Sequence, residues 1–386
     1  MNSQLNQAVK ILEKLVSFDS ISGRPTEGIV KYICDYLAHH GIEASLSKDS
    51  TGERANVFAS IGPKVDGGVL FNGHTDVVPV QGQDWHTEPF TLTQIADRLH
   101  GRGSVDMKGF LACMLAAVPV FKQARLTKPI YLAFTFDEEI GGLGMPVLLE
   151  YMSAEGIAPD IVIVGEPTES TIVTGHKGGF EMRTEVTGAE VHSCDPTKGV
   201  NAIVYAMKMV QKIEDIARLY ANSPDSNSPY NPPYTTFNVG KIDGGMARNA
   251  TAGWCHFDWE IRPLPGEDTQ PILTEIQSHA EELRAQMQAV NPATDIQIIT
   301  EVAVPALNDQ NADAAREFIS HITGLNSQQV VSFASDAGYF SDADFSTVLY
   351  GPGSINRAHK SDEYITLTEL EDGMEFLSKA AQYLSK

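Results

Sequence analysis

The strongest constraint on the fold is a series of short apolar runs that alternate with amphipathic helical patterns over the first 170 residues. The runs 130–136 and 160–164 are almost continuously apolar, which is typical of strands buried on both faces of a sheet. Helical patterns over 107–122 and 143–153 precede these two runs. This order predicts an α/β fold with a mixed, largely parallel sheet.

The pattern changes after the glycine pair 178–179. Between residues 180 and 303 the patterns follow the order strand, helix, strand, strand, helix, strand, which is that of a ferredoxin-like βαββαβ sandwich. From residue 304 the α/β character returns. The sequence therefore predicts a larger domain in two parts, 1–179 and 304–386, with a smaller domain inserted at 180–303.

Composition narrows the possible partners. The chain has 386 residues, too many for one ordinary core, and its 28 basic and 50 acidic residues give a formal charge of −22. Such a charge is repelled by phosphate backbones and anionic lipid, so we expect neither nucleic acid nor membrane as a partner. The four cysteines are widely spaced and the N-terminal pattern is amphipathic rather than signal-like, which favours a cytoplasmic protein.

Histidine and acidic side chains follow the predicted strands where each strand ends. His74, the pair Glu138 and Glu139, and Glu166 each come just after an apolar run, and Asp106 opens a predicted helix. Any one of them alone is better explained as a solvated loop residue or, for Asp106, as a helix N-cap. Together they fall at the edge of the sheet where sites form in α/β folds. Carboxylates that cluster repel one another unless cations neutralise them. A set of His, Asp and Glu ligands without thiolates suits zinc, manganese or cobalt. The number of these side chains is sufficient for two ions that share one ligand.

Two short-range patterns add detail to this site. Residues i and i+2 of an extended segment share a face, so Asp76 can accept a hydrogen bond from the second ring nitrogen of His74 and orient that ring. Glu138 and Glu139 are adjacent, and both cannot easily bind one metal. One of them can therefore be a ligand while the other faces the attacking water as a general base.

Several strings of the sequence match one known family. They are GHTDVVP (73–79), GRGSVDMKG (101–109), DEEIGG (137–142), GEPT (165–168), HKGG (176–179), the VHS segment with GVNAI (191–203), EIRPLPG (260–266) and GPGSINRAHKSDEY (351–364). In these strings the chain resembles the di-zinc aminoacylase, desuccinylase and carboxypeptidase family and, within it, the acetylornithine deacetylases. The resemblance implies a zinc-peptidase-like catalytic domain, with the inserted domain serving as a lid and for dimerisation.

The same resemblance implies a ligand set for two Zn²⁺ ions per chain, for which Co²⁺ could substitute. His74 and Glu166 would hold one ion, Glu139 and His359 would hold the other, and Asp106 would bridge the two.

The resemblance also implies further catalytic roles. Glu138 resembles the base that takes a proton from the attacking water and passes it to the leaving amine, and Asp76 resembles the residue that orients the first metal-binding histidine. His192 resembles a histidine that polarises the scissile carbonyl, supplied in relatives by the partner subunit of a homodimer. Asn249 and Arg262 resemble residues that hold the substrate carboxylate, a task that suits arginine. From the residues alone, His192 is more simply a surface histidine and Arg262 is ambiguous.

The reaction implied is hydrolysis of an N-acyl amino acid, with N2-acetyl-L-ornithine giving L-ornithine and acetate as in arginine biosynthesis. Two alternatives use the same framework, a succinyl-diaminopimelate desuccinylase and another aminoacylase or dipeptidase. A third alternative is a non-catalytic binding module on the same fold. Such a module is expected to have lost a metal ligand or the base, whereas this sequence has all five ligand positions and Glu138. The segment with Ser335 and Asp336 departs from the Thr-Glu-Ala of acetylornithine deacetylases by one methylene, which bears on the amine end of the substrate.

Overall fold

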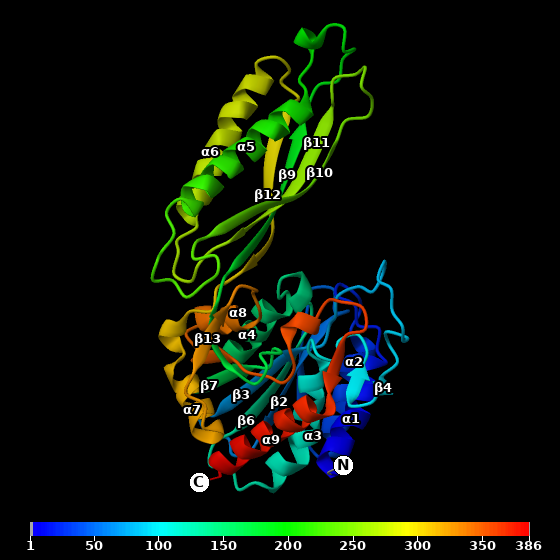
Figure 1. The fold of residues 1–386 in the computed structure, drawn as a ribbon, viewed down its shortest axis with the longest axis vertical. Coiled ribbons are helices and arrows are strands. Elements are labelled where there is room, and N and C mark those ends of the chain that lie inside the picture. The colour runs from blue at the N-terminus through cyan, green and yellow to red at the C-terminus, as the bar shows by residue number, and fades with distance from the viewer. Residues whose placement is uncertain (1–2, 386) are drawn as a thin grey trace. The chain divides into compact units, whose positions relative to one another are not determined.

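The apolar runs form the centre of an eight-stranded sheet in the computed structural model, which describes residues 3–385 (Figure 1). The strand order is β1-β2-β6-β3-β7-β14-β8-β13. Strands β6, β3, β7 and β14 run parallel at the centre, and antiparallel pairs join β1 to β2, β2 to β6 and β14 to β8. The bounds are β1 Ala44–Lys48, β2 Ala55–Ile61, β3 Val69–His74, β6 Ile130–Thr135, β7 Ile161–Val164, β8 Ile172–His176, β13 Gln328–Val331 and β14 Thr347–Leu349.

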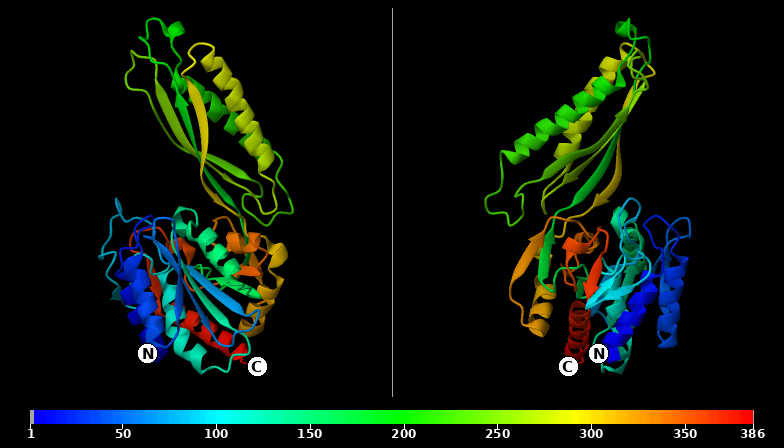
Figure 2. Two further views of the ribbon diagram at one scale, coloured as in Figure 1. Left: turned by 180° about the vertical axis from the view of Figure 1, so that it is seen from behind. Right: turned by 45° about the vertical axis from the view of Figure 1, so that its right-hand side comes forward.

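Helices cover both faces of this sheet (Figures 1 and 2). On one face α3 packs against β3 and β6 and joins α1, α2 and α9, while α4 and α8 contact each other on the opposite face. Phe71 of β3 illustrates the first layer, because its ring stacks on Phe121 of α3 at 6.3 Å and meets Phe376 of α9 edge-on at 6.0 Å. The bounds are α1 Ser3–Val16, α2 Glu27–His39, α3 Lys108–Gln123, α4 Gly144–Ala154, α7 Asp313–Thr323, α8 Ala337–Asp342 and α9 Leu367–Tyr383.

A second compact unit spans Lys177–Ala306 and Ser332–Ala334, and the remaining described residues form the first unit. Its four-stranded antiparallel sheet has the order β10-β11-β9-β12, with α5 and α6 packed against it (Figure 2). Strand β11 alternates buried and less buried residues, as a sheet with one covered face requires. The bounds are β9 Gly179–Thr187, α5 Ala202–Ala221, β10 Thr236–Gly244, β11 Trp254–Arg262, α6 Gln270–Gln288 and β12 Asp295–Val304.

These features confirm the predicted fold class, a mixed and largely parallel α/β sheet together with a βαββαβ unit. The sequence did not predict the polar edge strand β1, the strand β8, or a small sheet in which β5 (Arg98–His100) lies between β4 (Thr93–Ile95) and β15 (Tyr364–Thr366). None of the helices among the described residues is long and apolar enough to cross a membrane.

Candidate metal centre

Three neighbouring parallel strands deliver the first side chains of the site. His74 is the last residue of β3, and Glu166 follows the end of β7 by two residues. Glu138 and Glu139 open a 3₁₀ turn, η1 (Glu138–Ile140), that follows β6. Asp137 makes the turn from β6 into η1 with φ of 55°, and its carboxylate accepts a hydrogen bond of 2.7 Å from the Gly23 amide. The carboxyl ends of β3, β6 and β7 thus place these residues at one edge of the sheet.

Asp106 lies at the centre of the cluster. Its Oδ1 is 3.1 Å from Nε2 of His74, and its Oδ2 is 3.2 Å from Nε2 of His359. The same nitrogen of His359 is 2.9 Å from Oε2 of Glu139, and Nε2 of His74 is 3.9 Å from Oε1 of Glu166. The structure therefore brings all five predicted ligands into one chain of contacts. Within it, ligand atoms of His74, Asp106 and Glu139 all lie within 4.8 Å of one another.

The donor set fits a pair of metal ions. Each carboxylate oxygen of Asp106 faces a different histidine, which is the arrangement that a bridging ligand needs. Oε1 of Glu166 is buried and has no hydrogen-bond partner in the described structure. A buried carboxylate oxygen without a partner is costly, and a bound cation would offset that cost. Nitrogen and oxygen donors without thiolates suit zinc, manganese or cobalt.

Protons compete with metal for these ligands. Burial and the Asp106 carboxylate raise the pKa of Glu139 to about 7 and hold the pKa of Glu166 well above its usual value. Hydrogen bonds to Asp106 and Glu139 raise the pKa of His359 to about 10. Burial disfavours the charged form of His74, but hydrogen bonds to Asp106 and Asp76 outweigh burial and raise its pKa. Cations at this site would displace these protons.

Asp76 supports both the histidine and the glutamate segment. Nδ1 of His74 lies 3.0 Å from the main-chain oxygen of Asp76 and 3.6 Å from its Oδ1, so the carbonyl is the nearer acceptor. The carboxylate instead accepts the amides of Glu138 at 3.1 Å and Glu139 at 3.2 Å, and the Ser22 hydroxyl at 2.7 Å. The i, i+2 spacing predicted that the Asp76 side chain accepts the bond from the ring, whereas the main-chain oxygen is the acceptor. The bonds of the carboxylate to η1 and to Ser22 were not predicted.

Glu138 is partly buried beside the ligands. Burial and the carboxylates of Glu166 and Glu139 raise the pKa of Glu138 well above its usual value, although the nearby His74 acts in the opposite direction. A carboxylate with a raised pKa is suited to take and return a proton near neutral pH.

The departure at Ser335 and Asp336 lies close to this cluster. The Thr135 hydroxyl, at the end of β6, donates to Oδ2 of Asp336 at 2.6 Å, while Oδ1 is buried without a partner in the described structure. Burial raises the pKa of Asp336 to about 6. The charge of Asp336 also contributes to the raised pKa of Glu138 and of Glu166, so this acid acts through space on the predicted base and on a predicted ligand.

Three predicted residues belong to the second unit. Nδ1 of His192 accepts the Cys194 amide at 3.2 Å, and His192 pairs with Ala250 in an isolated β-bridge that sets it beside Asn249. The side chain of Arg262, at the end of β11, is held by Glu260, with Nε and Nη2 at 2.9 and 2.8 Å from Oε2. A substrate carboxylate would compete with Glu260 for this guanidinium.

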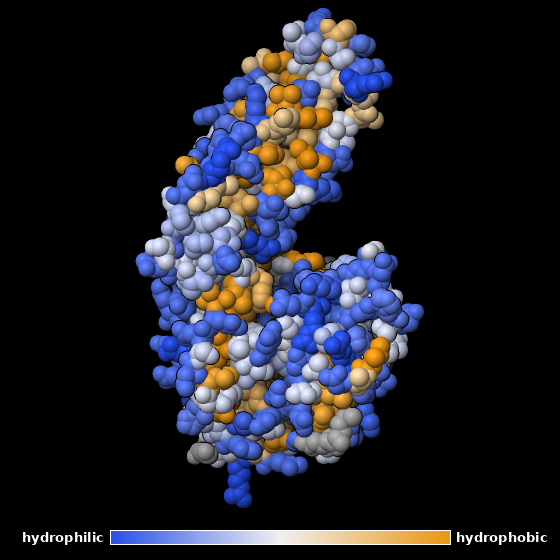
Figure 3. Space-filling model, in the orientation of Figure 1, coloured by the Kyte–Doolittle hydropathy of each residue, from blue (hydrophilic) through white to orange (hydrophobic). Residues whose placement is uncertain are grey.

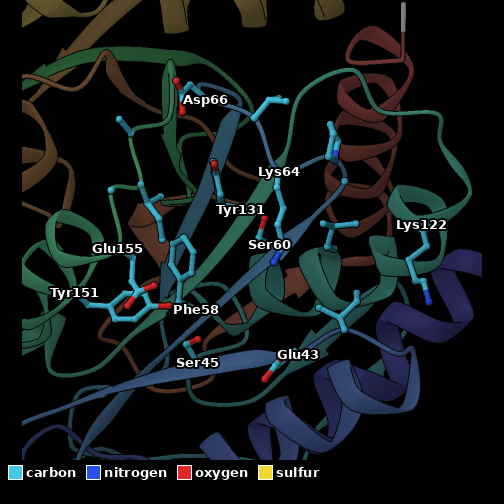
Figure 4. Close-up of a pocket in the computed structure, with 18 of the residues that line it drawn as sticks. Glu43, Ser45, Phe58, Ser60, Lys64, Asp66, Lys122, Tyr131, Tyr151 and Glu155 are labelled. Atoms are coloured by element: carbon cyan, nitrogen blue, oxygen red, sulfur yellow. The ribbon is translucent and has the colours of Figure 1, made fainter.

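A cavity of about 590 Å³ lies elsewhere in the first unit. The rings of Phe58, Tyr131 and Tyr151 gather on one side of it, with Phe58 at 5.6 Å from each of the other two (Figure 4). No predicted metal ligand lines this cavity.

Comparison with known proteins agrees with this geometry. The model of peptidase family M20/M25/M40 matches residues 70–383. The chain belongs to this family. It is 30% identical to an acetylornithine deacetylase of Yersinia pseudotuberculosis over 388 residues, covering 98% of this chain and 96% of the relative. The family resemblance seen in the sequence motifs is thereby confirmed, and the family supports an amide hydrolase of the aminoacylase and peptidase class.

Solved structures show the same fold. An M20 family metallo-carboxypeptidase from Sulfolobus solfataricus superposes with a TM-score of 0.75 at 19% identity and full coverage of both chains. A dinuclear metal-binding peptidase of the family from Bacillus subtilis superposes with a TM-score of 0.68 at 15% identity, covering 99% of this chain and 98% of that one.

The raised pKa of Glu139 predicts how the stability of the metal-free protein depends on pH. A glutamate in the unfolded chain titrates near about 4.3, so between there and about 7 the folded state holds a proton that the unfolded state has released. The free energy of unfolding in chelator should therefore fall as pH rises through this window. Denaturant unfolding between pH 4.5 and 7.5 measures this slope.

Glu139→Gln provides the control for this measurement, because its amide does not titrate. Its slope in chelator should be shallower than that of the wild type, and zinc should reduce the wild-type slope. Equal slopes for the two metal-free proteins would show that Glu139 does not hold this proton.

Proposed function

We propose that the protein is a dinuclear-metal amide hydrolase that removes the acyl group of an N-acyl amino acid, with N2-acetyl-L-ornithine as the substrate and L-ornithine and acetate as the products. The observation that carries the proposal is the Asp106 carboxylate shared between His74 and His359, next to an adjacent base. The 30% identity with an acetylornithine deacetylase over nearly the whole chain supports this substrate. A role in arginine biosynthesis goes with this reaction in our proposal, and the widely spaced cysteines favour a cytoplasmic location.

The contacts support the ligand assignment that the family resemblance implies. His74 and Glu166 would hold one Zn²⁺, Glu139 and His359 the other, and Asp106 both, with Co²⁺ able to replace zinc. When bound, the ions would polarise the scissile carbonyl and lower the pKa of the attacking water.

The other residues move the proton and hold the geometry. Glu138 accepts the proton of the attacking water and delivers it to the leaving amine nitrogen. Asp76 keeps Glu138 and Glu139 in register with His74, because its carboxylate binds both η1 amides while its carbonyl contacts the ring.

The second unit supplies substrate recognition in this proposal. His192 donates to the carbonyl oxygen as negative charge develops on it, and Asn249 and Arg262 bind the substrate carboxylate. In a homodimer His192 would come from the partner subunit, and the inserted domain would carry the interface.

The surface of the second unit supports a dimer. Strand β10 lies at an edge of its sheet, and Ile242 on that strand is 52% exposed. Met207, on the neighbouring helix α5, is 61% exposed. Figure 3 shows apolar residues gathered on this unit. An edge strand beside exposed apolar side chains favours pairing with a second copy.

Asp336 favours the alternative substrates that have a different amine end. Its side chain is one methylene shorter than the glutamate of acetylornithine deacetylases and lies near the base. A different amine end, as in succinyl-diaminopimelate or a dipeptide, would accommodate this change.

A side-by-side assay tests the substrate. Zinc- or cobalt-loaded protein should hydrolyse acetylornithine with a higher kcat/KM than succinyl-diaminopimelate, acetylmethionine or a dipeptide. A chelator should abolish this activity and added metal should restore it. A higher kcat/KM for another of these compounds would show that acetylornithine is not the preferred substrate. Full activity after long incubation in chelator would show that the reaction does not depend on metal.

Substitution of the two adjacent glutamates separates base from ligand. Glu138→Gln should keep about two metal ions per chain and lose nearly all turnover, because the amide has the same shape but cannot accept a proton. Glu139→Gln, its matched counterpart, should lose affinity for one ion in a metal titration. Loss of metal by Glu138→Gln would reverse the two assignments.

His192 is tested by complementation. His192→Ala should lower kcat by about 10²–10³-fold, as for removal of one oxyanion donor, with both metals still bound. Mixing it with Glu138→Gln should restore partial activity, since one site of a mixed dimer then has both residues. Absence of recovery in mixed dimers shown to form would place His192 in its own chain's site or outside catalysis.

A further inference from the structure

Glu363, which lies in the string 351–364 but has no role among those that the family resemblance implies, holds the loop that carries the central ligand. It is 2% exposed. Its Oε1 accepts the amides of Val105 at 2.9 Å and Asp106 at 3.1 Å, and its Oε2 accepts the Gly103 amide at 3.0 Å. Nη1 of Arg102 completes the shell at 2.6 Å. Four donors from one short loop therefore converge on a single buried carboxylate, and one of them is the main-chain amide of the bridging ligand.

Arg102 extends this network to the second histidine ligand. Its side chain is 1% exposed, and its Nη2 donates to Oε1 of Gln83 at 2.5 Å. Nε2 of Gln83 donates in turn to the main-chain oxygen of His359 at 2.9 Å. His359 has φ of 60°, a left-handed conformation that a residue other than glycine adopts only when its surroundings hold it there. The bond from Gln83 is one such constraint.

From these contacts we propose that Glu363, Arg102 and Gln83 form a positioning network that fixes Asp106 and His359 relative to each other. This inference rests on the proposed function, because it concerns where the metal ligands stand. A buried ion pair by itself is weak evidence for stabilisation of a fold. What distinguishes this network is that it binds main-chain groups of two segments, the amides of the loop that carries Asp106 and the main-chain oxygen of His359. In the proposed function Asp106 and His359 are ligands of the same ion.

The network has a definite effect on metal affinity. Outer partners of metal ligands typically contribute ten- to a hundredfold to affinity, because they keep the ligands in place before the metal arrives. Glu363→Gln leaves the size of the side chain unchanged. It replaces one acceptor oxygen by an NH₂ group, a donor that then faces the N–H donors of the loop. Gln83→Leu removes all three side-chain polar contacts of a half-buried residue, those with His359, Arg102 and Trp85. It leaves the buried pair of Arg102 and Glu363 intact.

Cobalt binding tests the proposal without recourse to activity. Metal-free wild type, Glu363→Gln and Gln83→Leu are titrated with Co²⁺ against a chromophoric chelator, and the visible spectrum of each cobalt form is recorded. Gln94→Leu is the matched control, because Gln94 is exposed on β4 and its Nε2 donates to the main-chain oxygen of Ala96. Circular dichroism reports whether each variant is folded.

The expected result is a loss of about ten- to a hundredfold in Co²⁺ affinity for Glu363→Gln. Gln83→Leu should show a smaller loss of Co²⁺ affinity, confined to one of the two ions. The visible spectra of the cobalt forms of both variants should change, and Gln94→Leu should match the wild type in affinity and spectrum. If Glu363→Gln does not fold, Gln83→Leu decides alone. Wild-type affinity and spectrum in the folded variants would overturn the positioning role. A wild type that binds no cobalt would instead refute the metal centre, and this proposal with it.

Discussion

The shared carboxylate of Asp106 is the interaction on which the site depends. Its two oxygens face His74 and His359, which come from β3 and from the loop before β15, segments almost 300 residues apart in the sequence. Glu139 and Glu166 bring further carboxylates to the same edge, and burial raises the pKa of both. Such a concentration of buried acids is unfavourable unless protons or cations neutralise it. The fold therefore forms a site that favours the binding of positive charge.

The loop before α3 shows how the backbone serves this purpose. Gly103 has φ of +79°, and a Cβ there would lie 2.6 Å from Cγ1 of Val77, so the loop requires glycine at that point. Its amide, like that of Asp106, is bound by Glu363. The position of Asp106 is thus set by main-chain bonds as well as by its own side chain.

Much of the fold, and the place of the site, followed from local patterns. Apolar runs predict central strands because a strand buried on both faces does not alternate apolar and polar residues. The predicted ligands converge because the carboxyl ends of neighbouring parallel strands lie at the same edge of the sheet. The polar strand β1 was missed because the sequence ASLSK carries little apolar signal. The Arg102–Glu363 pair was missed because its members are 261 residues apart and each looks like an ordinary surface charge. His192, Asn249 and Arg262 have no local signal of their own, and only the family resemblance points to them.

Anomalous diffraction from crystals grown with zinc, recorded above and below the zinc absorption edge, tests directly whether Asp106 bridges two ions. We expect two zinc peaks, each about 2.0–2.2 Å from its ligand atoms, with Asp106 bound to both. His74 and Glu166 should complete one shell, and Glu139 and His359 the other. A single peak, or peaks that Asp106 does not share, would show that the molecule does not hold a dinuclear centre bridged by Asp106.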